Sequence, residues 1–173
     1  MISKLKKNLI LTGMMGVGKS TVGKNLAKKL SCDFRDIDEL IELHEGVPIS
    51  TIFKNKGEQY FRNLEKKITL NELKKQKLVI ALGGGAFLQN SIRNQIKISG
   101  VSFWLDVNLD VILSRLINSK KRPLLFKKNL NDTVKKIYLE RKSIYNMADY
   151  RIKCKSLKPE VITNKIKSLY EKL

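Results

Sequence analysis

Short apolar runs alternate with longer segments in which apolar residues recur at helical spacing. The apolar runs, which we interpret as strands, are 8–12, 33–37, 78–82, 101–105 and 150–153. The segments with helical spacing are 19–30, 38–45, 49–55, 57–75, 90–97, 110–118, 131–147 and 159–171. The short runs lack strict alternation of apolar and polar positions, which is typical of strands buried on both faces of a parallel sheet. The pattern therefore predicts an α/β, three-layer, doubly wound fold on a five-stranded parallel sheet.

The first predicted strand leads directly into a phosphate-binding motif. Residues 13–20 read Gly-Met-Met-Gly-Val-Gly-Lys-Ser, which fills every fixed position of the P-loop pattern G-x-x-x-x-G-K-[ST], and a helical segment follows. The glycines let the backbone curl with its N–H groups inward, and the positive end of the helix dipole points to the same place. Lys19 adds a charge for the β- and γ-phosphates, and the Ser20 hydroxyl is suited to bind Mg²⁺. The motif predicts nucleotide binding; the alternative is a strand–turn–helix joint that happens to be rich in glycine.

Unusual residues also follow the second and third predicted strands. Asp36 and Asp38 stand two residues apart, which on a strand places both carboxylates on one side. Near a Mg²⁺–nucleotide complex, one could hold the metal and the other could orient or deprotonate an attacking hydroxyl; alternatively, one of them caps the next helix. The segment Gly83-Gly84-Gly85 allows a ligand to approach the backbone closely. Ligands of doubly wound sheets bind beyond the carboxyl ends of the strands, so these residues and the P-loop are predicted to line one crevice.

Three arginines are candidates for binding an anion. Arg141 falls in the middle of the apolar stripe of the last long helix, where its permanent charge needs an anionic ligand, a water-filled cleft or an internal salt bridge. Arg62 lies at the margin of an apolar stripe, and its pattern alone favours a solvated side chain. Arg122 lies in a basic segment between two predicted helices, which is either a surface loop or a lid that closes over ATP.

Composition limits the remaining classes of protein. A length of 173 residues, 42% of them hydrophobic, predicts one globular domain, residues 1–173. The net charge of +19 has no accompanying nucleic-acid motif, so we favour a solvated Lys-rich surface over nucleic-acid binding or the concentration of anionic substrates. No apolar stretch reaches the roughly 18 residues of a membrane span, and Cys32 and Cys154 lack metal-site spacing. We expect a cytoplasmic monomer that binds neither nucleic acid nor membrane.

In combination, these motifs resemble the shikimate kinase family, in order and over nearly the whole chain. The matching segments are 13–23, 34–38, Ile41-Glu42, Gly46, Ile52-Phe53, 57–65, 83–85, Arg122-Pro123-Leu124-Leu125, and Glu140-Arg141 with Tyr145 and Ala148. The resemblance implies a kinase that transfers the γ-phosphate of its co-substrate ATP, with Mg²⁺, to the 3-hydroxyl of shikimate. The product, shikimate 3-phosphate, lies on the route to chorismate and the aromatic amino acids.

The resemblance also implies roles for individual residues. The expected catalytic residues are Lys19, Asp38 and Arg122, with Arg122 supplied by a mobile lid around residues 118–128. The expected nucleotide-binding residues are Gly16, Val17, Gly18, Lys19, Ser20, Thr21 and Arg122. The expected shikimate-binding residues are Asp38, Arg62, Gly84 and Arg141, in which the two arginines pair with the substrate carboxylate. The metal would be held by Ser20 and, through water, by Asp36.

The chain departs from the family pattern near its end. Family members often carry an Arg that contacts the nucleotide in the loop before the final helix, where this chain reads Lys-Cys-Lys-Ser-Leu-Lys-Pro at 153–159. Two alternatives remain at this stage. One is another small-metabolite kinase of the P-loop group, acting on gluconate or a nucleotide; the other is a non-catalytic nucleotide-binding or nucleic-acid-associated protein.

Overall fold

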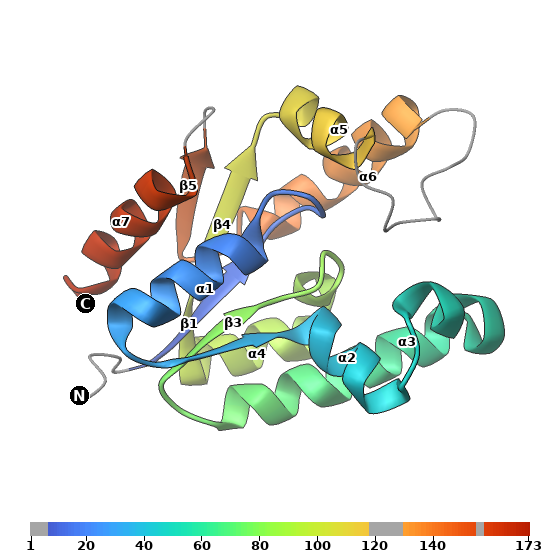
Figure 1. Ribbon diagram of the computed structural model, residues 1–173, viewed down its shortest axis with the longest axis horizontal. Helices are drawn as coiled ribbons and strands as arrows, with labels where there is room; N and C mark the ends of the chain where they lie inside the picture. Colours follow the sequence, from blue (N-terminus) through green and yellow to red (C-terminus); the bar gives the residue numbers. More distant parts are fainter. Residues whose placement is uncertain (1–6, 118–129, 155–157) are drawn as a thin grey trace.

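The fold is built on one five-stranded sheet. The computed structural model describes residues 7–117, 130–154 and 158–173 (Figure 1). The strands are β1 (Asn8–Thr12), β2 (Asp33–Asp36), β3 (Leu78–Ala81), β4 (Gly100–Val107) and β5 (Tyr150–Cys154). All pairings are parallel and the strand order is β2-β3-β1-β4-β5, so β1 lies in the centre, with Leu11 opposite Ala81 on one side and Phe103 on the other. This confirms the predicted sheet.

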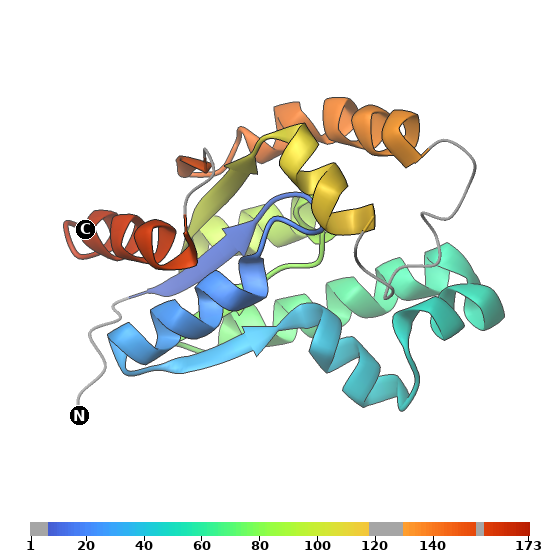
Figure 2. The same ribbon diagram turned by 45° about the horizontal axis from the view of Figure 1, so that its top comes forward.

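Helices cover both faces of the sheet. They are α1 (Lys19–Leu30), α2 (Ile37–Glu45), α3 (Ile49–Lys74), α4 (Asn90–Ser99), α5 (Leu109–Ile117), α6 (Leu130–Tyr145) and α7 (Pro159–Tyr170), with a 3₁₀ turn, η1 (Ala86–Leu88). Helices α1 and α7 pack side by side on one face, whereas α4 lies on the other (Figures 1 and 2). Every residue of β1 and β3 is buried, which explains why these strands show no alternation of apolar and polar positions. None of the described helices has the length and apolar character that a bilayer span requires.

One predicted boundary that bears on function differs from the structure. Strand β2 ends at Asp36, one residue earlier than predicted, because the Asp36 side chain accepts a hydrogen bond from the Asp38 N–H and caps α2. Asp38 therefore lies in the first turn of a helix, and the prediction that both carboxylates share one side of a strand is wrong. The predicted helices 49–55 and 57–75 are both present: they follow one another within α3 and are separated by a kink at Gly57, whose φ of 78° is left-handed.

The strand order brings three loops together. Strands β2, β3 and β1 are direct neighbours, and their carboxyl ends lead into Asp36, Gly83–Gly85 and the P-loop respectively. A hydrogen bond from the Leu82 N–H to the Leu11 carbonyl continues the sheet to the point where the loops begin. At the opposite end of β1, the Tyr170 hydroxyl of α7 accepts from the Lys7 N–H and donates to the Lys7 carbonyl. The molecule thus presents all three loops at one edge of the sheet.

Candidate active site

The P-loop has the backbone shape that an anion cradle requires. Gly13, Gly16 and Gly18 have φ values of 134°, 77° and 95°, which favour glycine, and Gly18 is the N-cap of α1. The Lys19 ammonium donates to the carbonyls of Gly13 and Met14, at 2.9 Å each, and so bridges the loop. The positive end of α1, its N–H groups and the Lys19 charge therefore converge on one place.

Hard oxygen donors lie beside the P-loop. The Ser20 hydroxyl donates to Asp36 Oδ2 at 2.5 Å, while the other oxygen of Asp36 accepts from the Asp38 N–H at 3.0 Å. Asp36 is buried and performs the capping role and the contact with Ser20 at once. No cluster of three or more His, Cys, Asp or Glu side chains within residues 7–117, 130–154 and 158–173 is arranged to hold a metal alone. A cation here would have to complete its coordination with water and nucleotide oxygens, as Mg²⁺ usually does.

Asp38 lies close to a second carboxylate that the sequence patterns did not single out. A Cβ atom at Gly83 would lie 2.7 Å from Asp38 Oδ1 and 2.6 Å from Glu65 Oε1, so both carboxylates lie beside this glycine. Burial raises the pKa of Glu65, and the nearby charge of Asp38 raises it further, against the opposing effects of Arg62 and Gln89. The position after β3 thus needs glycine because two acidic groups occupy the space of a side chain.

Arg62 is held in place by an ion pair with Glu65. Its Nη1 atom lies 2.9 Å from Glu65 Oε2, and a weaker contact of 3.3 Å joins it to Glu58. The Arg62 side chain is 27% exposed and that of Glu65 only 1%, so the solvated Arg62 favoured by the pattern alone is wrong. The Gln89 amide donates to Glu65 Oε2 at 3.2 Å and to the Arg62 carbonyl at 3.4 Å. The guanidinium lies directly against Gly85, where a Cβ atom would overlap it.

Arg141 reaches the same glycine loop from α6. Its Nη1 atom donates to the Gly84 carbonyl at 3.0 Å, and the Tyr145 hydroxyl donates to that carbonyl at 2.5 Å. Gly84 in turn lies beside the P-loop, because a Cβ atom there would be 3.4 Å from the Met15 nitrogen and 3.7 Å from Arg141 Nη1. The two arginines predicted from distant parts of the sequence therefore flank one dipeptide, Gly84-Gly85, next to the phosphate cradle.

Not every predicted residue is described by the structure, and some contacts near the P-loop and the arginines were not predicted. Arg122 and the predicted lid at 118–128 lie outside the described residues. Arg115 of α5 donates to the carbonyls of Gly16 and Val17 at 3.3 and 3.2 Å, which ties α5 to the P-loop. The sequence patterns missed Glu65 and Gln89 as parts of the site. Glu65 carried a usable signal, since it follows Leu64 of an apolar stripe and lies three residues after Arg62.

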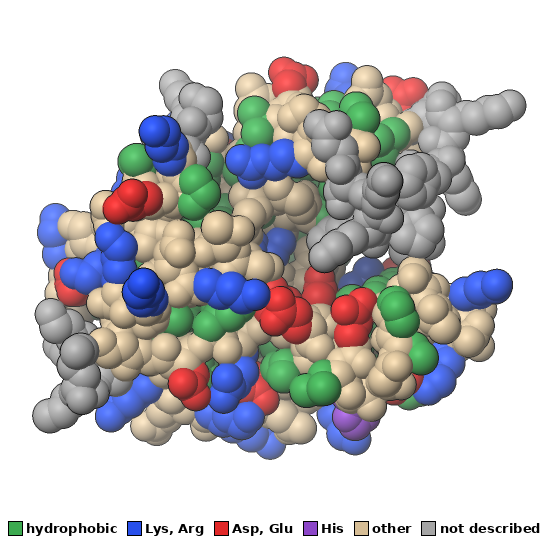
Figure 3. All heavy atoms as spheres, in the orientation of Figure 1, with side chains coloured by type: hydrophobic (Ala, Val, Ile, Leu, Met, Phe, Trp, Pro, Cys, Tyr) green, Lys and Arg blue, Asp and Glu red, His purple; other side chains and the backbone are tan. Residues whose placement is uncertain are grey.

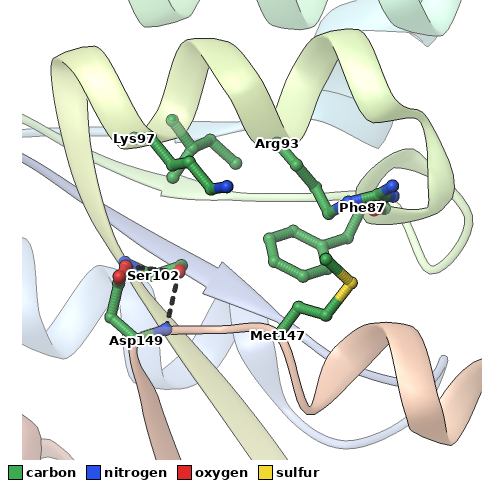
Figure 4. Close-up of a pocket in the computed structure, with 7 residues that line it drawn as sticks. Phe87, Arg93, Lys97, Ser102, Met147 and Asp149 are labelled. Atoms are coloured by element: carbon green, nitrogen blue, oxygen red, sulfur yellow. Dashed lines mark hydrogen bonds between the residues drawn. The ribbon is translucent and has the colours of Figure 1, made fainter.

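A small cavity lies elsewhere in the molecule. It has a volume of about 20 Å³, room for one water molecule, and is formed between the η1–α4 segment and the turn that leads from α6 to β5 (Figure 4). The lining side chains include Phe87 and Met147, which face each other, and Asp149, which is bonded to Ser102. Among the described residues, none of the candidate site residues lines this cavity.

Taken together, the fold and the site define a P-loop kinase in which two arginines and two carboxylates surround a glycine loop beside the P-loop. The family model for shikimate kinase matches residues 15–171. A curated shikimate kinase from Sulfurihydrogenibium sp. (strain YO3AOP1) is 44% identical over 160 residues, which cover 92% of this chain and 95% of the relative. The chain belongs to the shikimate kinase family.

Solved structures agree with this assignment. The shikimate kinase of Acinetobacter baumannii, determined in complex with shikimate, superposes with a TM-score of 0.92 at 33% identity and covers 96% of this chain and 93% of its own. A gluconokinase from Sinorhizobium meliloti 1021 reaches a TM-score of only 0.60 at 13% identity, over 97% of this chain and 93% of its own, which reflects the shared fold alone. The comparisons confirm the family predicted from the sequence.

Proposed function

We propose that this chain transfers the γ-phosphate of ATP to the 3-hydroxyl of shikimate, giving shikimate 3-phosphate. Membership of the shikimate kinase family supports the reaction class and both substrates. The observation that carries the residue assignments is the placement of Arg62 and Arg141 around Gly84-Gly85, beside Met15 of the P-loop. Within one domain built on one sheet, this arrangement brings a carboxylate-binding pair next to a phosphate cradle.

The two guanidinium groups suit the carboxylate of the acceptor. Each presents a planar fork of N–H donors that matches a carboxylate, and neither can lose its charge. Arg62 is already paired with Glu65, so part of its charge is neutralised, whereas Arg141 contacts the neutral Gly84 carbonyl. We assign Arg141 as the stronger anchor for the acid and Arg62 as the residue that fixes its orientation. Gly84 leaves room for the ring because it has no side chain.

The P-loop residues Gly16 to Thr21 would bind the phosphates. Lys19 at present spans the Gly13 and Met14 carbonyls, and it would exchange these contacts for phosphate oxygens when ATP binds. The hydroxyl of Ser20 and, through water, the carboxylate of Asp36 fit Mg²⁺, because both are hard oxygen donors beside the phosphate site. Bound Mg²⁺ would neutralise charge on the transferring phosphate.

Asp38 is the residue best suited to act on the attacking hydroxyl. The first turn of α2 places its carboxylate at the glycine loop that follows β3, where it would orient the 3-hydroxyl and accept its proton. The proposed mechanism is in-line transfer in which positioning and charge neutralisation supply most of the rate. Lys19 would neutralise charge on the phosphates, and Arg122 would add to this from the segment outside the described residues.

The proposal is tested by a coupled assay with ATP, Mg²⁺ and an acceptor panel of shikimate, gluconate and nucleoside monophosphates. Among these acceptors, we expect only shikimate to give ADP release. The NMR spectrum of the product should show a phosphorus–proton correlation that places the phosphate on the 3-oxygen. Turnover of gluconate or a nucleotide in preference to shikimate would overturn the acceptor assignment. Phosphorylation of another shikimate hydroxyl would overturn the role given to Asp38.

A further inference from the structure

The phenol of Tyr145 lies at the joint between the acceptor site and the P-loop. Its side chain is fully buried, and its hydroxyl donates to the Gly84 carbonyl at 2.5 Å. Arg141, one helical turn earlier on α6, donates to the same carbonyl at 3.0 Å, and its charge acts to lower the pKa of Tyr145. Two donors from one helix therefore converge on a single carbonyl oxygen.

We propose that Tyr145 is a positioning residue that holds the Arg141 guanidinium and the Gly84 peptide in the geometry that binds shikimate; this inference rests on the proposed function. Residues four apart on a helix share a face, so Tyr145 and Arg141 approach Gly84 from the same side. A carbonyl oxygen has two lone pairs, and here the two donors occupy both. Without the phenol hydroxyl, only the hydrogen bond to Gly84 would hold the Arg141 guanidinium, which would then be free to rotate away from the acid.

The ring of Tyr145 fixes this set relative to the phosphate cradle. The indole of Trp104 on β4 packs against it with a centroid distance of 6.0 Å, and the hydroxyl also contacts the Met14 sulfur at 4.0 Å. Met14 belongs to the P-loop, and the residue after it, Met15, lies against Gly84. One side chain therefore touches α6, the central sheet and both loops that meet at the reacting groups. A displaced Tyr145 would change the distance between bound acid and bound phosphate.

The charges around the phenol favour its role as a donor. Burial raises the pKa of Tyr145, and the opposing effects of Arg141 and Arg62 do not cancel this increase, to which Glu65 adds. The hydroxyl therefore keeps its proton across the working pH range and can donate it to the Gly84 carbonyl. A deprotonated phenol would instead pair with Arg141 and release Gly84.

The substitution Tyr145→Phe tests the inference, because it removes only the hydroxyl from the buried ring. Tyr138→Phe is the matched control: it lies on the same helix and loses a hydroxyl that donates to Asp106 at 3.2 Å, away from the glycine loop. We expect Tyr145→Phe to raise the KM and the Kd for shikimate by about five- to thirtyfold, with a smaller change in kcat and an unchanged KM for ATP. Tyr138→Phe should leave the shikimate constants unchanged.

A double-mutant cycle separates positioning from general destabilisation. If Tyr145 acts through Arg141, then adding Tyr145→Phe to an Arg141→Met chain should cause little further loss of shikimate affinity, because the group to be positioned is already gone. Additive losses, or equal losses in KM for shikimate and for ATP, would overturn the inference. Wild-type protein that fails to phosphorylate shikimate would refute the proposed function itself, whereas active wild-type protein with an unchanged KM in Tyr145→Phe would refute the positioning role alone.

Discussion

Gly83→Ala is the sharpest test of the role proposed for Asp38, because the added methyl group would overlap the carboxylates of Asp38 and Glu65. A Cβ atom at this position would lie 2.6 Å from Glu65 Oε1 and 2.7 Å from Asp38 Oδ1, whereas ordinary contact begins at 3.4 Å. In Gly83→Ala, these two oxygens must therefore move by about 0.7–0.8 Å. The backbone of Gly83 is not left-handed, so alanine fits the local conformation and the fold should survive.

The displacement should appear mainly in kcat. A misplacement of roughly 1 Å at a reacting group can cost about a hundredfold in rate, so we expect kcat for shikimate phosphorylation to fall by about ten- to a hundredfold. The KM for shikimate should rise by less, through the shift of Glu65 beneath Arg62, and the KM for ATP should not change. The assay is steady-state kinetics with each substrate varied in turn, together with the melting temperature as a check on folding.

Gly85→Ala provides the contrasting variant, two residues further along the same loop. The three atoms nearest to its added methyl group all belong to the Arg62 guanidinium. This substitution should therefore raise the Kd for shikimate more than it lowers kcat, the reverse of Gly83→Ala. If Gly83→Ala kept the kcat of the wild type, Asp38 would not occupy this place in the working enzyme, and its assigned role would be wrong.

Three further predictions concern the phosphate site and the buried carboxylate. Lys19→Ala should lower kcat by at least about a hundredfold with an unchanged circular dichroism spectrum, and normal turnover would refute the cradle. Removal of divalent cations with EDTA should abolish activity without lowering the melting temperature, and added Mg²⁺ should restore it; activity that persists in EDTA would count against a metal at Ser20. Burial raises the pKa of Glu65 above its ordinary value of 4.5, so Glu65 should take up a proton at a pH above 4.5. Protonated Glu65 no longer forms an ion pair with Arg62, so shikimate affinity should weaken on acidification in that range. Gln89→Leu removes a hydrogen bond that lowers this pKa, so the same loss should occur at higher pH, and identical pH profiles would contradict the assignment.

The elements that sequence predicted best are those fixed by strong local signals. The all-buried strands, the P-loop glycines and the helix from Lys19 to Leu30 were predicted with their correct bounds or nearly so. A general rule for doubly wound sheets predicted that the three strand ends lie together, and the order β2-β3-β1 makes these strands direct neighbours. The family was confirmed by the comparisons. The expectations of a monomer, of a cytoplasmic location and of no binding to nucleic acid or membrane stay predictions.

What sequence could not predict depends on contacts between distant segments. The pattern of α3 leaves Arg62 at the margin of an apolar stripe, and its burial depends on Gly85, which lies against the guanidinium, and on Gln89, which bonds to the Arg62 carbonyl and to Glu65. The helix predicted to begin at Asp38 is present, but Asp38 does not share one side of a strand with Asp36, because capping by Asp36 ends the strand there. The charge excess likewise has no pattern that predicts its arrangement. Figure 3 shows Lys and Arg side chains scattered over the visible face, with acidic side chains gathered beside a hollow near its centre.

The double hydrogen bond between Tyr170 and Lys7 has a practical consequence for handling this enzyme. It joins the beginning of β1 to the end of α7, at the edge of the sheet opposite the three reacting loops. The main chain at Lys7 and the end of α7 therefore meet on the side away from these loops. A circularly permuted chain that connects Lys7 to Tyr170 through a short linker should keep the loops in place and preserve catalysis.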